Sequence, residues 1–223
     1  MKKTTTLLMA LFAVAVSVQA EIYSGTCGSK LTWSLNTEDS TLVIEGSGIM
    51  DSSRPWARYK SNIAYISLPN GLTSIGNSAF YSCENIRSID IPEGVLAISE
   101  RAFAACNNLS SVNLPTSVLS IGKSAFSGCR KLASVIIPEG VQTIEYAAFG
   151  GCDILATISI PSTVTSLSTG AFSGSKNLES ITVSDGNTQY SSSDGVLYNK
   201  NEVISVSSRK TRKMHHYRWS NKY

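Results

Sequence analysis

Apolar residues recur along most of the chain at a fixed interval of 23 residues, from Ile66 to Val183. The interval contains no insertion or deletion, and it holds for a phenylalanine, a proline and a cysteine position: Phe80, Phe103, Phe126, Phe149 and Phe172; Pro69, Pro92, Pro115, Pro138 and Pro161; Cys83, Cys106, Cys129 and Cys152. A stack of identical units gives such a period, because each unit buries its apolar edge only against its neighbours. The pattern predicts a solenoid whose repeats occupy residues 64–183.

The repeat at residues 109–131 shows what one turn of the stack should contain. Val112 and Leu114 lie two residues apart, so they face the same side of a strand, which Pro115 ends. A second, shorter extended segment is expected to begin at Val118 on the opposite wall. A tight helical turn at 124–126 should then carry Phe126 into the centre, where each stacked phenylalanine contributes about 1.5–3 kcal/mol by burial.

The 23-residue period is absent from residues 21–63, which are expected to form an N-terminal β cap. Leu31, Trp33 and Leu35 alternate with polar residues, a polar turn follows at 36–40, and alternation resumes after it. This pattern predicts a β-hairpin that covers the exposed first edge of the solenoid. Trp33 and Trp56 have two interpretations: they pack within the cap, which is the more frequent use of such residues, or they form a pair that stacks on sugar rings.

The period fades after Val183, and the chain is expected to close with a capping hairpin at residues 184–206. An Asp-Gly pair lies between Tyr190 and Tyr198, flanked by β-formers, and is typical of a hairpin turn. Residues 207–223 form a basic tail with two interpretations: a native tail that touches an anionic surface, or a non-native ending such as a shifted reading frame or a truncation. The tail is expected to be disordered.

The charge distribution separates the tail from the body. Residues 21–200 hold 11 Lys and Arg against 15 Asp and Glu, whereas residues 201–223 hold six Lys and Arg against one Glu. The formal charge of +3 therefore does not describe the folded body, which carries no basic surface of the kind that binds nucleic acid.

The first 20 residues have the features of a cleaved signal peptide. Lys2 and Lys3 precede an uncharged apolar run at residues 7–16, and Val18 and Ala20 provide the small residues that signal peptidase requires. The run is too short to cross a bilayer, which needs about 20 residues. We therefore predict export, with cleavage after Ala20, to the medium or the cell surface, and no transmembrane segment in the mature chain.

The cysteines and histidines predict no catalytic or metal site. Four of the five cysteines share one repeat position, so they should form a buried row of free thiols rather than disulfides, while Cys27 has no evident partner. No Cys-x₂-Cys pair occurs, and His215 and His216 are adjacent in the tail, which suits chelation poorly. The chain is therefore expected to be no enzyme and to use no metal or cofactor.

The segment from Leu109 to Cys129 resembles the BspA-like class of bacterial leucine-rich repeat, the surface-antigen type. Residues 24–35 and the pair Pro55-Trp56 are similar to the N-terminal module of that family. The resemblance covers about residues 22–200. It implies a leucine-rich repeat solenoid with a curved parallel sheet, displayed outside the cell, and binding of an extracellular protein or glycan, in some members a host matrix protein. It carries over no catalytic residue.

In such an array the exposed side of the parallel strands forms a concave wall, which is the predicted ligand-binding face. Strand alternation places these residues on it: Tyr65, Ser67, Ser88, Asp90, Ser111, Asn113, Ser134, Ile136, Thr157, Ser159, Ser180 and Thr182. Six strands spaced by about 4.8 Å would make a wall about 24 Å across. The same hydroxyls are also common on strands that bind nothing. The chain is thus predicted to be a binding or adhesion module, or alternatively a structural spacer of a cell-surface assembly.

Overall fold

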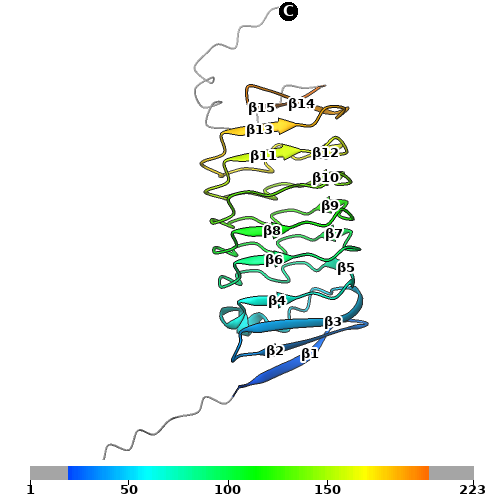
Figure 1. The fold of residues 1–223 in the computed structure, drawn as a ribbon, viewed down its shortest axis with the longest axis vertical. Coiled ribbons are helices and arrows are strands. Elements are labelled where there is room, and N and C mark those ends of the chain that lie inside the picture. Colours follow the sequence, from blue (N-terminus) through cyan, green and yellow to red (C-terminus); the bar gives the residue numbers. More distant parts are fainter. Residues whose placement is uncertain (1–19, 201–223) are drawn as a thin grey trace, which may run out of the picture.

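The structure, a computed structural model, describes residues 20–200. The predicted leader up to Gln19 and the basic tail at 207–223 lie outside these residues. In the described part the chain forms a column of stacked coils, with β1 at one end and the β14–β15 hairpin at the other (Figure 1). The predicted solenoid of 23-residue repeats is confirmed.

Each coil contributes to three walls, two of which contain strands. The strand wall contains β4 (Tyr65–Ser67), β6 (Ser88–Asp90), β8 (Ser111–Asn113), the segment 134–136, β11 (Thr157–Ile160) and β13 (Ser180–Val183). The ladder wall, on the opposite side as expected, contains β5 (Gly71–Ile75), β7 (Ala97–Ile98), β9 (Ser120–Ile121), β10 (Thr143–Ile144) and β12 (Ser166–Leu167).

The continuous parallel ladder runs along the ladder wall, in the order β3-β5-β7-β9-β10-β12. On the strand wall, in contrast, β6 pairs with β8 and β11 pairs with β13, while β4 pairs with the cap strand β3 (Thr41–Ile49). The expected parallel strands thus occupy the predicted positions on the predicted ligand-binding wall, but they pair in separate short ladders and do not form one continuous curved sheet.

The third wall, here called the turn wall, consists of residues 78–82, 101–105, 124–128, 147–151 and 170–174. The predicted helical turn at 124–126 is wrong. Ser124 has a φ of +55° and Gly128 a φ of +76°, so the backbone is left-handed at two positions of this coil. This geometry directs the N–H groups of Ser124, Phe126 and Gly128 along the column, where each donates to a carbonyl of the next coil at 2.7–2.9 Å. In a helix those N–H groups would donate to carbonyls of the same coil and not to the next one.

The core is the phenylalanine spine that the period predicted. Adjacent rings in the series from Phe80 to Phe172 stack with centroids 5.2–6.0 Å apart, and Trp56 extends the stack at its N-terminal end. All five phenylalanines are at most 2% exposed.

The cap closes the N-terminal end of the column by two routes. β1 (Ile22–Gly28), β2 (Leu31–Asn36) and β3 form an antiparallel meander, which contains the predicted hairpin and one further strand; a 3₁₀ helix follows at Ala57–Asn62. The side chains of Trp56 and Arg54 then donate to the Ala79 and Tyr81 carbonyls at 2.8 and 3.1 Å. These two donors take the place of the backbone N–H groups that a preceding coil would supply to the turn wall.

The C-terminal end is closed over two of its three walls. β14 (Tyr190–Ser193) and β15 (Val196–Asn199) form the expected hairpin. An N–H group is called outward here when it points away from the rest of the column. The outward N–H of Ile181 in β13 donates to the Gly195 carbonyl of the hairpin at 2.9 Å. The Tyr190 hydroxyl accepts the N–H of Leu167 in β12 at 2.8 Å. On the turn wall, the outward N–H groups of Gly170, Phe172 and Gly174 have no partner within residues 20–200.

Candidate functional site

The predicted binding residues lie together on the strand wall, and their side chains point to solvent. Eleven of the twelve are exposed; the exception, Ser180, is half-buried. The turn of the C-terminal hairpin covers Ser180, because a Cβ added to Gly195 would meet its Oγ at 2.9 Å. The part of the wall that a ligand can reach therefore extends from β4 to β11 and includes Thr182 of β13, which is exposed.

The wall is composed mainly of hydroxyl groups, with one polar pair in its first half. Ser88 lies beside Ser111 and Asp90 beside Asn113 in the β6–β8 ladder, where the Asn113 Nδ2 donates to the Asp90 carboxylate at 2.8 Å. Thr157 and Ser159 are aligned in the same way with Ser180 and Thr182. Each of these hydroxyls can both donate and accept a hydrogen bond, so the wall can bind amide or sugar hydroxyl groups without a charge.

Two large apolar side chains stand out on this polar wall. Tyr65 is 66% exposed and Ile136 is 84% exposed, the highest value among the large hydrophobic residues of the described chain. Ile136 also lies in the one coil whose strand-wall segment is unpaired. Within the described residues, no backbone hydrogen bond joins 133–137 to β8 or to β11.

The tryptophan pair of the cap is not a sugar platform. Trp33 and Trp56 are 6% and 1% exposed, and their rings meet edge to face with centroids 5.9 Å apart. A sugar ring needs an open aromatic face, and neither tryptophan offers one. Their packing interpretation is therefore confirmed.

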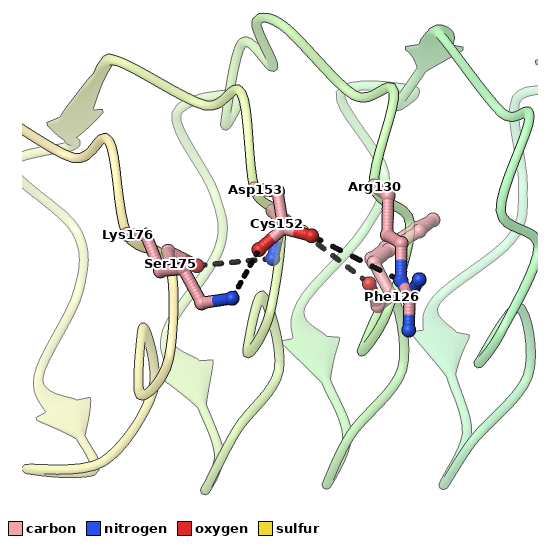
Figure 2. Close-up of polar contacts among 6 residues, drawn as sticks. All are labelled: Phe126, Arg130, Cys152, Asp153, Ser175 and Lys176. Atoms are coloured by element: carbon pink, nitrogen blue, oxygen red, sulfur yellow. Dashed lines mark hydrogen bonds and ion pairs between the residues drawn. The ribbon is translucent and has the colours of Figure 1, made fainter.

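A second concave surface, which sequence reasoning missed, lies on the turn wall. Small residues at equivalent positions of three coils form the floor of a shallow groove of about 330 Å³, and Arg130, Asp153 and Lys176 line one side of it: the floor residues are Ser127, Gly128, Gly150, Gly151 and Gly174. Figure 2 shows Asp153 between the two cations, 3.9 Å from Arg130 Nε and 4.0 Å from Lys176 Nζ. Such exposed pairs contribute little stability. The sequence did contain a signal for this groove. The pairs Ser127-Gly128 and Gly150-Gly151 recur at the 23-residue interval, and a charged residue follows each pair two positions later.

The cysteine row is buried and free, as predicted. All five cysteines are unpaired, and the Sγ atoms of Cys106, Cys129 and Cys152 lie 3.1–3.4 Å from the carbonyl oxygens of Phe80, Phe103 and Phe126, to which their thiols donate. Burial raises the pKa of the Cys83 and Cys152 thiols to about 12. The fifth repeat places Ser175 at this position, and its hydroxyl donates to the Phe149 carbonyl at 2.7 Å. The thiols are thus neutral packing groups between coils.

Within residues 20–200, no group of three or more His, Cys, Asp or Glu side chains is placed to hold a metal ion. The same part of the chain contains no helix of the length and hydrophobicity that a membrane span requires.

Comparison with known proteins agrees with this architecture. The chain matches the sequence profile described as "BspA type Leucine rich repeat region", which occurs in six copies over residues 56–179 and 97–214. Among curated proteins, none matches the chain.

The solved structures that resemble the chain include several bacterial leucine-rich repeat proteins. A leucine-rich repeat protein of Eubacterium ventriosum superimposes with a TM-score of 0.58 at 24% identity, over 81% of this chain and 49% of that one. A leucine rich cell surface protein of Faecalibacterium prausnitzii gives 0.53 at 25% identity, over 82% and 61% of the two chains. The pneumococcal vaccine antigen PcpA gives 0.52 at 19% identity, over 80% and 54%, which shows a shared fold. The chain thus spans about half to three fifths of the length of these proteins. The protein belongs to the family of BspA-type leucine-rich repeat proteins.

Proposed function

We propose that the protein is a non-catalytic extracellular binding or adhesion module that recognises a protein or glycan ligand on its strand wall. One observation carries the proposal: two isolated, solvent-exposed apolar side chains stand on an otherwise hydroxyl-lined wall. Ile136 is 84% exposed, more than the other large apolar residues that the described coils leave in solvent, such as Tyr146 at 54% and Leu96 at 47%. Folding therefore removes little of its apolar surface from water. A ligand that covers it would supply the burial that the fold does not.

The chemistry of the wall fits a long, uncharged ligand surface. The hydroxyls provide hydrogen bonds in register across neighbouring coils, while Tyr65 and Ile136 provide separate apolar contacts in different coils. An extended peptide or a short glycan has this combination of repeated polar groups and small apolar patches. Full burial of one aliphatic side chain is worth about 1.5–3 kcal/mol, and about 1.4 kcal/mol corresponds to a tenfold change in affinity. Ile136 alone could therefore change affinity about tenfold or more.

The predicted export is consistent with the same function. A signal peptide at residues 1–20 would direct the chain out of the cytoplasm. The F. prausnitzii protein that the chain resembles is described as a cell surface protein. We infer that this protein too acts in the medium or at the cell surface, with an extracellular protein or glycan, including host matrix proteins, as its partner class.

The experiment is a binding screen of the exported chain against immobilised matrix proteins and a glycan array, followed by variants of the wall. The double variant Ser111→Arg, Ser134→Arg places two bulky charges on the strand wall and should abolish binding, and Ile136→Ser should weaken it about tenfold. Gln142→Arg is the matched control, because Gln142 is exposed on the ladder wall. Full binding by the double variant would move the site away from this wall. No saturable binding to any ligand would favour the alternative, a structural spacer of a surface assembly.

A further inference from the structure

β1 is the outermost strand of the nine-stranded sheet, and in the described chain it pairs only with β2 (Figure 1). The hydrogen bond from the Thr37 N–H to the Glu21 carbonyl, at 3.1 Å, fixes which residues of β1 bond to β2. Because bonded and non-bonded pairs alternate in an antiparallel ladder, Tyr23 and Gly25 also face β2. The backbone groups of Ile22, Ser24 and Thr26 then face outward, and they have no partner within residues 20–200.

This edge lacks most of the features that usually protect an edge strand. Natural edges carry a charged side chain or a proline, bend at a β-bulge, or are covered by another segment. β1 has a register shift between Thr26 and Gly28, at the end of the strand, and Ile22–Thr26 stay in regular register with β2. The seven residues from Ile22 to Gly28 contain no Lys, Arg, Asp, Glu or Pro, and Ile22 is 70% exposed. The opposite end of the column differs, because its hairpin covers the outward N–H groups of Ile181 and Val183 in β13. The terminal strand of the strand wall is thus covered at the C-terminal end, whereas β1 is uncovered at the N-terminal end within the described residues.

Head-to-tail stacking of two copies does not account for the free edge. The unpaired N–H groups of Gly170, Phe172 and Gly174 at the C-terminal end need the carbonyl row of another coil. In a second copy that row belongs to the first coil, where Arg54 and Trp56 already occupy the carbonyls of Tyr81 and Ala79. A polar cap therefore blocks the heterologous contact, and it leaves the β1 edge available for a symmetric one.

We propose that β1 pairs with β1 of a second copy of this chain, antiparallel, about a two-fold axis at Ser24. In this register Ser24 lies opposite Ser24 of the second copy, and Ile22 lies opposite Thr26. Every outward N–H and C=O group of the three residues then meets its counterpart, since each bonded pair of an antiparallel ladder exchanges two hydrogen bonds. The edge is self-complementary, as a two-fold interface requires. The contact brings no like charges together, because the strand has none.

The first experiment uses the chain from Glu21 onward, which begins at the predicted cleavage site, and measures its mass by sedimentation velocity across a series of concentrations. The wild-type chain should form a dimer. Ser24→Lys should be monomeric, because it places two ammonium groups face to face at the axis while its side chain stays in solvent. Thr32→Lys is the matched control: Thr32 is exposed on the same face but one strand further in, so this variant should dimerise. A monomeric wild-type chain, or a Ser24→Lys chain as dimeric as wild type, would overturn the proposal.

The second experiment tests the register independently of charge. Opposed Cα atoms of a bonded antiparallel pair lie about 5.5 Å apart, within the range of about 4.4–6.8 Å that a disulfide spans. Ser24→Cys should therefore form a disulfide-linked dimer on mild oxidation, while Thr32→Cys should not, and the five natural cysteines are buried and inert. Equal cross-linking of both variants would indicate random collision and refute the register. Binding of an added peptide to a monomeric chain would identify β1 as a site for a foreign strand instead, and would equally refute pairing with a second copy.

Discussion

Phe126 lies at the middle of the phenylalanine spine, and its truncation to alanine tests how the coils hold one another. The side chain is fully buried, between Phe103 at 5.3 Å and Phe149 at 5.4 Å, centroid to centroid. Phe→Ala in a core costs about 3–5 kcal/mol, and each aromatic pair is worth about 0.5–1.5 kcal/mol beyond its buried area. Since Phe126 belongs to two such pairs, we expect a loss at the upper end of this range, about 5 kcal/mol.

Phe172 provides the comparison, because it is the same residue at the end of the same spine. It is 2% exposed and has one aromatic neighbour in the spine, Phe149, at 6.0 Å. In a stack whose units contact only their neighbours, a central truncation weakens two interfaces and a terminal one weakens a single interface. Phe172→Ala should therefore cost about 1 kcal/mol less than Phe126→Ala, the value of one aromatic pair.

Urea unfolding followed by circular dichroism measures both differences. The midpoint should fall in the order wild type, Phe172→Ala, Phe126→Ala, and Phe126→Leu should lie between wild type and Phe126→Ala because it leaves a smaller cavity. Equal midpoints for the central and terminal alanine variants would refute the additive-interface reasoning. A loss below about 1 kcal/mol for Phe126→Ala would show that the spine is not the core, since deletion of a buried aromatic costs several times that amount.

Three further predictions concern the ends of the column and its thiols. Asn187→Ala should lower the free energy of unfolding, measured in urea, by about 2–3 kcal/mol. The reason is that the buried Asn187 side chain donates to two carbonyls and accepts from two N–H groups. The control Asn177→Ala, at an exposed position, should change this free energy by less than about 0.5 kcal/mol. Arg54→Ala should lower the thermal midpoint, because it leaves the Tyr81 carbonyl without its donor. Burial raises the folded pKa of Cys152 to about 12 from an ordinary value of 9.0, so the free energy of unfolding should fall as pH rises above 9.0, where only the unfolded thiol ionises. Cys152→Ser should reduce that fall in a thermal melt at pH 8 and pH 10, and a fall as steep as in the wild type would exclude this thiol as its source.

The repeat architecture could be predicted from the sequence because each coil has the same residue types at the same positions and buries them against the next coil. A phenylalanine every 23 residues fixes the coil length, and the proline fixes the end of each strand, so the spine and strand positions follow directly. The free state of the cysteines was also predictable, since equivalent positions in a stack point the same way. These features depend only on the contacts between adjacent coils.

The backbone of the turn wall could not be predicted in the same way. Ser-Ala-Phe is compatible with a helical turn, and only the stacked neighbour makes the left-handed conformation of Ser124 favourable, by accepting its N–H at 2.9 Å. The interrupted ladder at 134–136 is equally hidden, because Ser134 and Ile136 occupy ordinary strand positions in the sequence. The groove beside Asp153 requires three coils to be aligned before its floor exists. All three features depend on how neighbouring coils align, which the sequence of a single coil does not contain.

The proposed binding wall and the proposed dimer edge lie on one face of the molecule. Ser24 lies beside Ser34, Ser34 beside Val43, and Val43 beside Ser67, so the outer face of β1 continues without a break into the strand wall. A two-fold axis between antiparallel edge strands stands perpendicular to the sheet, and it therefore leaves the strand walls of both copies facing the same side. A dimer built in this way would present two binding walls to one surface, and simultaneous engagement can raise apparent affinity 10²–10⁴-fold. Ser24→Lys should then release faster than wild type from a densely coated surface, while binding a soluble monovalent ligand with unchanged affinity. Equal release rates for a dimeric wild type and monomeric Ser24→Lys would show that the two walls cannot engage together.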